Sequence, residues 1–324
     1  MDDAAIADRL SSALGAPVRD LARLTGGATR PTWAFEAELD GAWAKLILQL
    51  SVERDPLPGE RTGALPRVTG GNDAAIQQAA AAAGVPVPPI VLVLDETHGL
   101  GDGVVARFVP GETLGRRIVR DPPPNLAARC GTVLARIHAI DPSPLGFLQP
   151  FDAARQLAVY RDVFQSYEHP HPVAEYAFRW VGEHLPGEGR QTVVHADFRN
   201  GNMIVDETGI AAVLDWEIAQ LGDPMQDLGW LCVRTWRFGG PKPVGGFGDY
   251  DELFAAYEAE SGQPVDVERV RFWEAFGCLK WSVMTMMKGQ RVRFGAPQTL
   301  EAAAIGRRMD EPLWDFMRLT DSAA

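Results

Sequence analysis

The sequence predicts an α+β protein with two lobes, a small lobe built on a mainly antiparallel sheet and a larger lobe that is mostly helical. Up to residue 109, short apolar segments alternate with turns rich in glycine, as in antiparallel strands. From residue 126 onward, apolar residues recur at helical spacing. The 324 residues, 46% of them hydrophobic, are enough for two cores. We therefore expect a small lobe over residues 1–109 and a large lobe over residues 110–324.

The amino-terminal segments predict a helix followed by a hairpin. Ile6, Leu10 and Leu14 recur at helical spacing, which predicts a short amphipathic helix over residues 4–14. Two apolar segments follow, and Asp40-Gly41 between them is typical of a tight hairpin turn. The strands of this hairpin are expected over residues 33–39 and 42–50.

A glycine-rich turn is expected between a strand that opens at residues 21–24 and the hairpin. Its residues are Thr25-Gly26-Gly27-Ala28-Thr29-Arg30. Backbone N–H groups in such a turn can lie over phosphates, and Gly26 and Gly27 are the candidates. Two adjacent glycines are more often only a turn, so this pattern predicts a phosphate site only together with the motifs further along the chain.

The remainder of the small lobe predicts one helix and two strands. The segment 51–72 is rich in proline, glycine and charge and is expected to be a loop. The alanine-rich segment 73–83 predicts a helix that ends at Gly84. Strands are expected over residues 90–94 and 104–109, and Pro110-Gly111-Glu112 then predicts a hinge.

Amphipathic segments fill the large lobe. The aromatic residues along several of them are more often core than ligand contacts. His138, near the end of the first segment, is expected to be a packed or capping histidine rather than a metal ligand. The expected helices cover residues 126–139, 153–167, 173–185, 252–260, 267–288 and 299–317.

Residues 193–217 combine a strand end, a polar loop and a hairpin. Two apolar strands, 203–206 and 211–214, are joined by the turn 207–210. If they pair in this way, residues whose numbers sum to 417 face each other, and the residues just outside both strands lie at one open end.

The residues at that open end are Asn202 and Asp215, which thirteen positions separate in the sequence. An amide oxygen and a carboxylate brought together suit Mg²⁺. Asp197 lies just upstream, placed to accept a proton from a nucleophile. A base, two magnesium ligands and a short polar loop together predict a site for phosphoryl transfer.

The segment that follows predicts a capped helix. Asp223 is expected at the N-cap and Pro224 at the first helical position. Gln226 is expected to complete a capping box with Asp223.

The composition excludes several classes of function. A net charge of −12 argues against non-specific binding to nucleic acid or to anionic membranes. No apolar run approaches the roughly 20 residues of a membrane span, and the acidic start lacks the apolar core of a signal peptide. Cys130, Cys232 and Cys278 have no CxxC spacing and predict buried thiols in a reducing compartment. We expect a cytoplasmic protein that binds neither nucleic acid nor membrane.

Three motifs occur in a fixed order in the large lobe. They are His195-x-Asp197-x-x-x-x-Asn202, then Leu214-Asp215-Trp216-Glu217, then Gly222-Asp223-Pro224-x-x-Asp227. Together they resemble the aminoglycoside phosphotransferase / choline kinase superfamily. Within it, the chain is similar to a group of phosphotransferase-family proteins and to the kinase-like domain associated with acyl-CoA dehydrogenases. The resemblance covers nearly the whole chain, with specific motifs in the large lobe and weak ones in the small lobe.

The resemblance implies a protein-kinase-like fold and a kinase that uses ATP and Mg²⁺ to phosphorylate a hydroxyl group of a small molecule. Asp197 matches the catalytic base, and Asn202 and Asp215 match the magnesium ligands. Arg199 is placed to stabilise the transferred charge. Asp227 resembles the aspartate that accepts hydrogen bonds from the backbone of the catalytic loop.

The resemblance also assigns the nucleotide to residues 1–109, and catalysis and acceptor binding to residues 110–324. The glycine-rich turn with Gly26 and Gly27 would then lie over the phosphates. The backbone of residues 106–109, with Ala106, Phe108 and Val109, would meet adenine.

One position departs from the family pattern. The family carries a lysine or arginine on the third strand that pairs with the phosphates, and here Gln49 stands at that position. Lys45 on the same strand face, or Arg54, could substitute for it. The partner glutamate of the family is matched by Asp73, one methylene shorter.

Two hypotheses follow. The first is a small-molecule kinase whose acceptor is a hydroxy acid or its thioester, an amino alcohol or an aminoglycoside-like compound, held by residues 153–185 and the terminal helices. The second is a nucleotide-binding pseudokinase that regulates or binds a partner, which Gln49 and Asp73 motivate.

Overall fold

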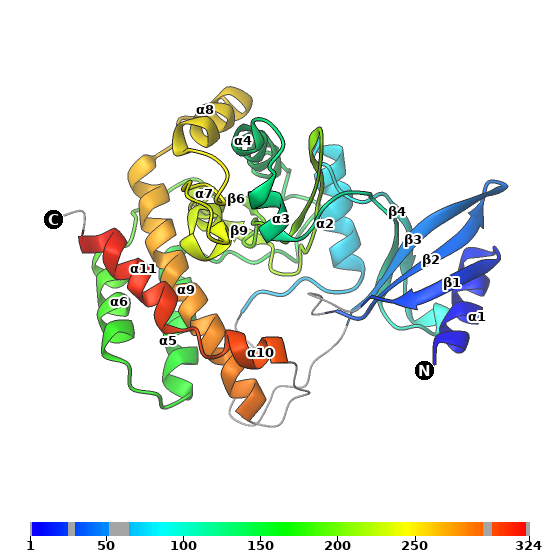
Figure 1. Ribbon diagram of the computed structural model, residues 1–324, viewed down its shortest axis with the longest axis horizontal. Coiled ribbons are helices and arrows are strands. Elements are labelled where there is room, and N and C mark those ends of the chain that lie inside the picture. Colours follow the sequence, from blue (N-terminus) through cyan, green and yellow to red (C-terminus); the bar gives the residue numbers. More distant parts are fainter. Residues whose placement is uncertain (1, 25–29, 52–64, 294–299, 322–324) are drawn as a thin grey trace.

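The computed structural model of the protein describes residues 2–24, 30–51, 65–293 and 300–321. A sheet lies at one end of the molecule beside the N-terminus, and a larger helical part extends from it toward the C-terminus (Figure 1). This arrangement confirms the expected α+β class with a small antiparallel sheet and a mostly helical remainder. The division between residues 109 and 110 stays a prediction.

The sheet is antiparallel throughout, in the order β1-β2-β3-β5-β4. Helix α1 (Asp3–Leu14) covers one face, because Ile6 and Leu10 share a core cluster with Leu46 and Leu48. Successive side chains of a strand point to opposite faces, so Gln49 and its neighbours at every second position point away from α1. The strands are β1 (Val18–Arg23), β2 (Thr32–Leu39), β3 (Ala42–Leu50), β4 (Ile90–Leu94) and β5 (Gly103–Arg107).

The turn between β2 and β3 is the expected tight hairpin. Asp40 and Gly41 both have positive φ, 54° and 78°. A two-residue hairpin of type I′ needs that conformation at both positions, which explains the Asp-Gly pair.

Helix α2 (Gly71–Ala82) precedes β4 in the chain but packs with the helical part. Its buried residues Ile76 and Ala80, and Val85 just beyond it, belong to the larger core cluster rather than to the cluster under α1. In Figure 1, α2 lies between the sheet and the other helices. It is therefore the element that couples the two parts.

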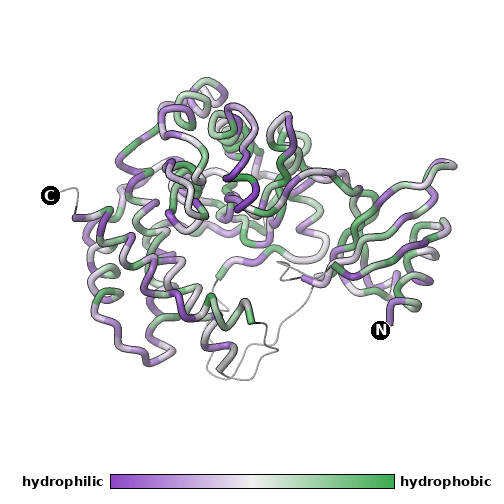
Figure 2. The backbone as a smooth tube through the Cα atoms, in the orientation of Figure 1, coloured by the Kyte–Doolittle hydropathy of each residue, from purple (hydrophilic) through white to green (hydrophobic). Residues whose placement is uncertain are grey.

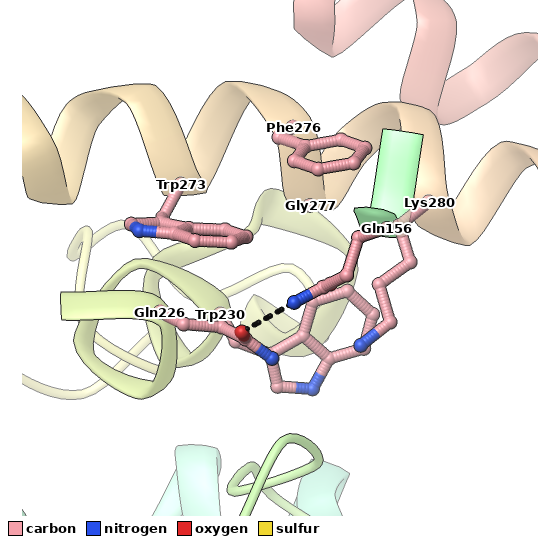
Figure 3. Close-up of a pocket in the computed structure, with 7 residues that line it drawn as sticks. All are labelled: Gln156, Gln226, Trp230, Trp273, Phe276, Gly277 and Lys280. Carbon is pink, nitrogen blue, oxygen red and sulfur yellow. Dashed lines mark hydrogen bonds between the residues drawn. The ribbon is translucent and has the colours of Figure 1, made fainter. Parts of the chain in front are cut away.

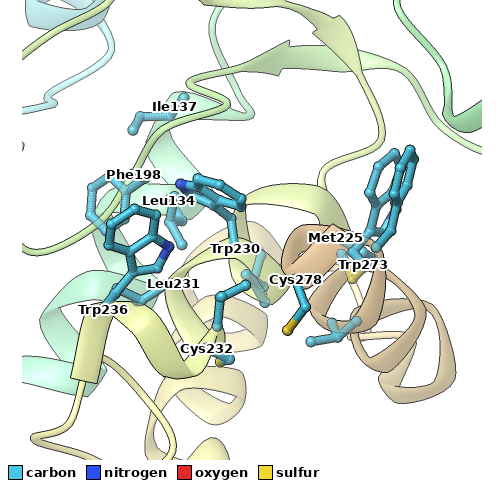
Figure 4. Close-up of a cluster of buried hydrophobic side chains, with 14 of the residues drawn as sticks. Leu134, Ile137, Phe198, Met225, Trp230, Leu231, Cys232, Trp236, Trp273 and Cys278 are labelled. Atoms are coloured by element: carbon cyan, nitrogen blue, oxygen red, sulfur yellow. The ribbon is translucent and has the colours of Figure 1, made fainter. Parts of the chain in front are cut away.

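The larger cluster is the main core of the molecule. Trp230, Trp236 and Trp273 are each at most 3% exposed and pack with leucines and buried thiols (Figure 4). Hydropathy changes along each helix, as expected of amphipathic helices with one face in this core (Figure 2). All three cysteines are buried and free, which confirms the expected thiols. The helices are α3 (Gly115–Arg120), α4 (Leu126–Ile137), α5 (Ala153–Ser166), α6 (Pro172–Glu183), α7 (Met225–Cys232), α8 (Tyr250–Ser261), α9 (Val267–Arg293), α10 (Leu300–Ile305) and α11 (Asp310–Asp321).

Two short antiparallel pairs lie inside the helical part. They are β6 (Thr192–Val194) with β9 (Gln220–Gly222), and β7 (Met203–Asp206) with β8 (Gly209–Val213). Within the described residues, no helix combines the length and apolar character that crossing a membrane requires.

The predicted register of the β7–β8 hairpin is wrong. Met203 pairs with Val213 and Asp206 with Gly209, so the register is displaced by one residue at the open end and by two at the turn. The reason is a bulge between Ile204 and Val205 and a tight turn in which the Asp206 carboxylate accepts hydrogen bonds from the backbone of Thr208 and Gly209. The expected four-residue turn is therefore only two residues long.

The predicted capping box at α7 is also wrong. Asp223 does accept a hydrogen bond from the Met225 backbone, at 2.9 Å. However, the Gln226 side chain accepts from Gln156 at 2.8 Å instead of turning back to Asp223. The second oxygen of Asp223 binds Arg269 and Trp273 of α9, so tertiary contacts replace the local cap.

Close packing of α4 on α8 generates a stability prediction. A Cβ atom added to Gly131 would lie 2.3 Å from the Leu253 carbonyl oxygen and 2.9 Å from the Tyr257 nitrogen. Because both neighbours are backbone atoms, Gly131→Ala is expected to lower the free energy of unfolding by about 1–3 kcal/mol. Denaturant unfolding of the purified variant measures this change.

Gly182→Ala is the matched control, because it places the same methyl group in another helix. The new Cβ would meet only the Leu157 side chain, at 3.6 Å. Alanine has the higher helix propensity, so a gain of up to about 1 kcal/mol is expected. Equal losses in the two variants would contradict the close α4–α8 contact.

Candidate active site

The site is built where the loop 195–202 meets the open end of the β7–β8 hairpin. The Leu214 backbone N–H donates to the Asn202 carbonyl oxygen at 2.8 Å, so the residue before β7 and the residue after β8 lie together. Asn202 and Asp215 are thus at one end of the hairpin, as the sequence predicts, although the pairing beyond them differs.

Asp197 is held on both carboxylate oxygens. Oδ2 accepts from the side-chain amide of Asn202 at 2.6 Å. Oδ1 accepts from the Trp230 indole at 2.8 Å and from Arg199 Nε at 3.0 Å. The side chain is 13% exposed, so it still faces the surface of the site. A carboxylate fixed in this way is oriented to accept one proton from a neighbouring hydroxyl.

Asp227 binds the backbone of the loop 195–202. Its two oxygens accept from the backbone N–H groups of His195 and Ala196, each at 2.8 Å, and one of them also contacts His138 Nε2 at 3.1 Å. These partners keep the pKa of the buried carboxyl below its usual range, although burial alone would raise it. The structure therefore confirms that Asp227 binds the loop backbone and that His138 is a packed histidine.

Ala196 occupies a strained backbone conformation next to the candidate base. Its φ is 65°, a region that alanine rarely adopts. Its N–H is held by Asp227, and its carbonyl oxygen accepts from Lys280 Nζ at 3.2 Å. His195 adds a brace, because its ring nitrogens bond the Leu214 carbonyl and the Asp197 N–H. Strain persists where surrounding bonds fix it, which is common at functional sites.

Three carboxylates meet at the hairpin end. Burial, followed by repulsion from Glu217 and Asp197, raises the pKa of Asp215 to about 7. Asn202 donates through its side-chain nitrogen, and its side-chain oxygen makes no hydrogen bond with the described residues. Repelling carboxylates beside an amide oxygen are the donors that a hard divalent cation prefers.

Asn202 and Asp215 alone do not fill the coordination shell of a metal ion. Among the described residues, no three His, Cys, Asp or Glu side chains form a ready metal site. Mg²⁺ usually takes one or two protein oxygens and completes its shell with water and substrate phosphates. Asn202 and Asp215 fit that pattern.

The cation beside Asp73 is Arg30. Its Nη1 lies 2.8 Å from Asp73 Oδ2, and both side chains are buried. Lys45, one of the two candidates to substitute for a cation at position 49, is exposed, and Gln49 pairs with Thr32 across the β2–β3 ladder. Gly26, Gly27 and Arg54 lie outside the described residues.

Arg30 was not predicted as the substitute cation, although it is the last residue of the glycine-rich segment. The sequence prediction placed that cation on the third strand or in the loop after it.

The linker to the helical part extends β5. Ala106 pairs with Ile47 in the sheet, and the Phe108 N–H donates to the Lys45 carbonyl at 3.0 Å. The Val109 N–H makes no hydrogen bond with any described residue. The Phe108 side chain is 47% exposed. The linker thus offers a free backbone donor and an exposed ring.

Lys280 approaches the loop from α9, where its ammonium donates to the Ala196 carbonyl oxygen. Burial lowers its pKa to about 8, although Asp197 and Asp227 act in the opposite direction. The ammonium lies 4.5 Å from the centre of the Trp230 ring. Lys280 and Trp230 also line a small pocket, together with Gln156, Gln226, Trp273, Phe276 and Gly277 (Figure 3).

Lys280 and Trp230 were not predicted from the sequence. A single lysine within an apolar helical segment is the signal for Lys280, because an unpaired charge is rarely buried without a role. No sequence motif around Trp230 indicates a functional role, because this side chain reaches Asp197 only through the packing of α7.

Comparisons with known proteins show the family and the fold. The sequence profile described as "Phosphotransferase enzyme family" matches residues 20–273. Acyl-CoA dehydrogenase family member 10 of Mus musculus is 28% identical over 272 residues, which are 74% of this chain and 25% of that protein. The chain thus spans about a quarter of the length of this relative.

Solved structures share the fold. A Ralstonia eutropha protein assigned as an aminoglycoside phosphotransferase superposes with a TM-score of 0.72 and 22% identity, over 98% of each chain. Spectinomycin phosphotransferase, in complex with ADP and spectinomycin, gives a TM-score of 0.67 and 13% identity, also over 98% of each chain. At these identities, the likeness shows the kinase-like fold.

Asp227→Asn tests the support of the loop. Asparagine keeps the shape but turns one acceptor into an NH₂ group, which would face a backbone N–H or His138. The unfolding free energy is expected to fall by about 2–4 kcal/mol, because buried donors lose their acceptor. Denaturant unfolding gives the value.

The control for this variant is Asp141→Asn. Asp141 accepts from the Ser143 backbone and hydroxyl at the surface, so its replacement is expected to change the unfolding free energy much less. A loss at Asp227 no larger than that at Asp141 would show that the loop does not depend on the buried carboxylate.

Proposed function

This chain belongs to the phosphotransferase enzyme family, and from that premise we propose that it is a kinase that transfers the γ-phosphoryl group of ATP, with Mg²⁺, to a hydroxyl group of a small molecule. One observation carries the proposal. Asp197, held by Asn202, Trp230 and Arg199, stands beside the open hairpin end where Asn202 and Asp215 meet. A base, an amide oxygen and a carboxylate are thereby brought to one place.

The proposed transfer is an in-line displacement. The acceptor hydroxyl gives its proton to the Asp197 carboxylate as its oxygen bonds to the γ-phosphorus. The bond from that phosphorus to the bridging oxygen breaks, and ADP leaves with the electron pair. Arg199, 3.0 Å from Asp197, brings a positive charge next to the oxygens that carry charge in the transition state.

Mg²⁺, when bound, neutralises charge on the β- and γ-phosphates. Asn202 and Asp215 would hold it. Burial, followed by repulsion from Glu217 and Asp197, raises the pKa of Asp215. A bound cation would offset that repulsion, which supports this assignment.

The nucleotide is proposed to bind between the sheet and the helical part. Adenine would meet the backbone of residues 106–109, where the Val109 N–H makes no hydrogen bond with the described residues. A structural neighbour, spectinomycin phosphotransferase, was solved with ADP, which supports nucleotide use in this fold. The segment with Gly26 and Gly27 is proposed to cover the phosphates, as its glycines favour.

The charge on the acceptor side favours an acidic or neutral acceptor. Lys280 is buried beside the loop and makes no ion pair with a described residue. A polycationic aminoglycoside would bring further positive charge toward it. A hydroxy acid or its thioester would instead offer acceptor oxygens, so we rank these above amino alcohols and aminoglycoside-like compounds.

The second candidate is a pseudokinase that binds nucleotide without turnover. Gln49 at the expected cation position favours it. The discriminating experiment is an ATP-consumption screen over hydroxy acids, alcohols, choline-like amines, sugars and aminoglycosides, run beside a nucleotide-binding measurement. Binding without turnover across the panel would support the pseudokinase.

Asp197→Asn tests the kinase mechanism. The amide cannot accept the acceptor proton, so kcat is expected to fall about 100- to 10,000-fold. Affinity for ATP is expected to persist, because Asp197 faces the acceptor. Coupled-enzyme assays for ADP release and calorimetric titration with ATP give the two values.

Glu207→Gln serves as the control, since this exposed carboxylate lies in the turn of the same hairpin. It is expected to retain wild-type turnover. If Asp197→Asn were equally active, Asp197 would not be the base.

A further inference from the structure

Arg30 is a buried guanidinium at the boundary between the sheet and the helical part. It is 9% exposed. Nη1 bonds Asp73 of α2 at 2.8 Å, and Nη2 bonds the Val68 carbonyl at 3.0 Å. Nε lies 3.5 Å from Glu217, which follows the hairpin. One side chain therefore ties the end of the glycine-rich segment to α2 and to the segment that carries Asp215.

The surroundings of Arg30 are negatively charged. Burial lowers its pKa, but Asp73 and Glu217 outweigh that effect and raise it, with a further contribution from Asp215. The same cation lowers the pKa of Asp215 against the repulsion of its neighbours. Arg30 is thus within electrostatic reach of the proposed magnesium ligand.

Arg30 also stands close to the position where the family cation is missing. Thr32 pairs with Gln49, and the Leu50 N–H donates to the Pro31 carbonyl at 3.0 Å, so the ladder extends toward Arg30. Residues placed diagonally across such a ladder are about 7–8 Å apart, which an arginine side chain can span. A positive charge on the residue two positions before β2 can therefore reach the neighbourhood of position 49.

We propose that Arg30 binds the phosphates of the nucleotide and replaces the strand β3 cation that Gln49 lacks. This inference rests on the proposed function. It explains how the site can bind phosphates with a cation although position 49 is neutral. The neutral residue at position 49 then no longer favours the pseudokinase hypothesis.

The donor count of arginine fits this role. Guanidinium has five N–H donors in a planar fork. Asp73, Val68 and Glu217 each face one nitrogen of the guanidinium, and one N–H on each terminal nitrogen makes no hydrogen bond with a described residue. A lysine could not hold these three partners and still offer a donor in a fixed direction.

The alternative is a purely structural ion pair between Arg30 and Asp73. The two roles predict different affinities for ligands with and without phosphates. A phosphate-binding arginine contributes to ATP affinity and not to adenosine affinity. A structural brace would affect both ligands equally, through the shape of the site.

The test is calorimetric titration of ATP with Mg²⁺, and of adenosine, into the wild type and Arg30→Gln. Loss of a charge-assisted hydrogen bond predicts an ATP affinity lower by about 10- to 100-fold, with adenosine affinity unchanged. Arg19→Gln is the matched control, because Arg19 pairs with Glu36 on the exposed part of the same sheet. It is expected to bind both ligands like the wild type.

Two further variants distinguish a loss of phosphate binding from misfolding. Arg30→Gln leaves Asp73 buried without its cation, so Arg30→Gln/Asp73→Asn removes both charges and keeps both shapes. It is expected to show the same selective loss of ATP affinity. Arg30→Gln/Gln49→Lys returns a cation to β3 and is expected to recover a substantial part of the ATP affinity.

The outcomes separate the inference from the proposed function. If the wild type prefers ATP over adenosine and Arg30→Gln/Asp73→Asn keeps that preference, the inference is wrong and the kinase proposal stands. An equal loss for both ligands also overturns the inference. If the wild type itself does not prefer ATP, the proposed nucleotide is wrong, and the role of Arg30 falls with it.

Discussion

The site depends on one buried carboxylate, that of Asp227. A buried charge is costly unless several donors surround it. Here two backbone N–H groups and His138 supply them, and the same bonds hold Ala196 at a φ of 65°. Because Lys280 holds the other side of that residue, the peptide before Asp197 is fixed from α7 and from α9. The direction of the Asp197 carboxylate is therefore set by elements far from it in the sequence.

The second constraint is the balance of charge around the loop. Carboxylates come from the loop and the hairpin end, and burial together with their mutual repulsion raises the pKa of Asp215 to about 7. Arg199 supplies a cation within the loop, and two further cations come from other elements, Arg30 from the segment before β2 and Lys280 from α9. An acidic centre surrounded by cations suits the proposed transfer of a phosphoryl group. The net charge of −12 does not reveal this local arrangement.

The sequence predicted the features that depend on neighbouring residues, such as the helices and the hairpin. The contacts of Arg30 and Lys280 with distant segments depend on tertiary packing and were not predicted. The relation between Asn202 and Asp215 follows from a short hairpin, so it survived an error in register that a bulge caused. The capping box failed because Gln226 found a tertiary partner. Arg30 and Lys280 meet the loop only through the assembled fold, and no short-range spacing connects them to it. The fold class could be predicted from the sequence, because the periodicity of apolar residues changes sharply from that of strands to that of helices along the chain.

The neutral residue at position 49 and the arginine at position 30 form one change rather than two. Cations at both places would lie close together and would repel each other. Neutral Gln49 next to Arg30 avoids that repulsion and keeps one positive charge for Asp73. The shorter acid is consistent with this geometry, since arginine is longer than lysine and approaches α2 from the segment just before β2. A missing cation on β3 is therefore evidence of relocation, and the ion pair that identifies it is visible only when α2, β2 and the hairpin end are seen together.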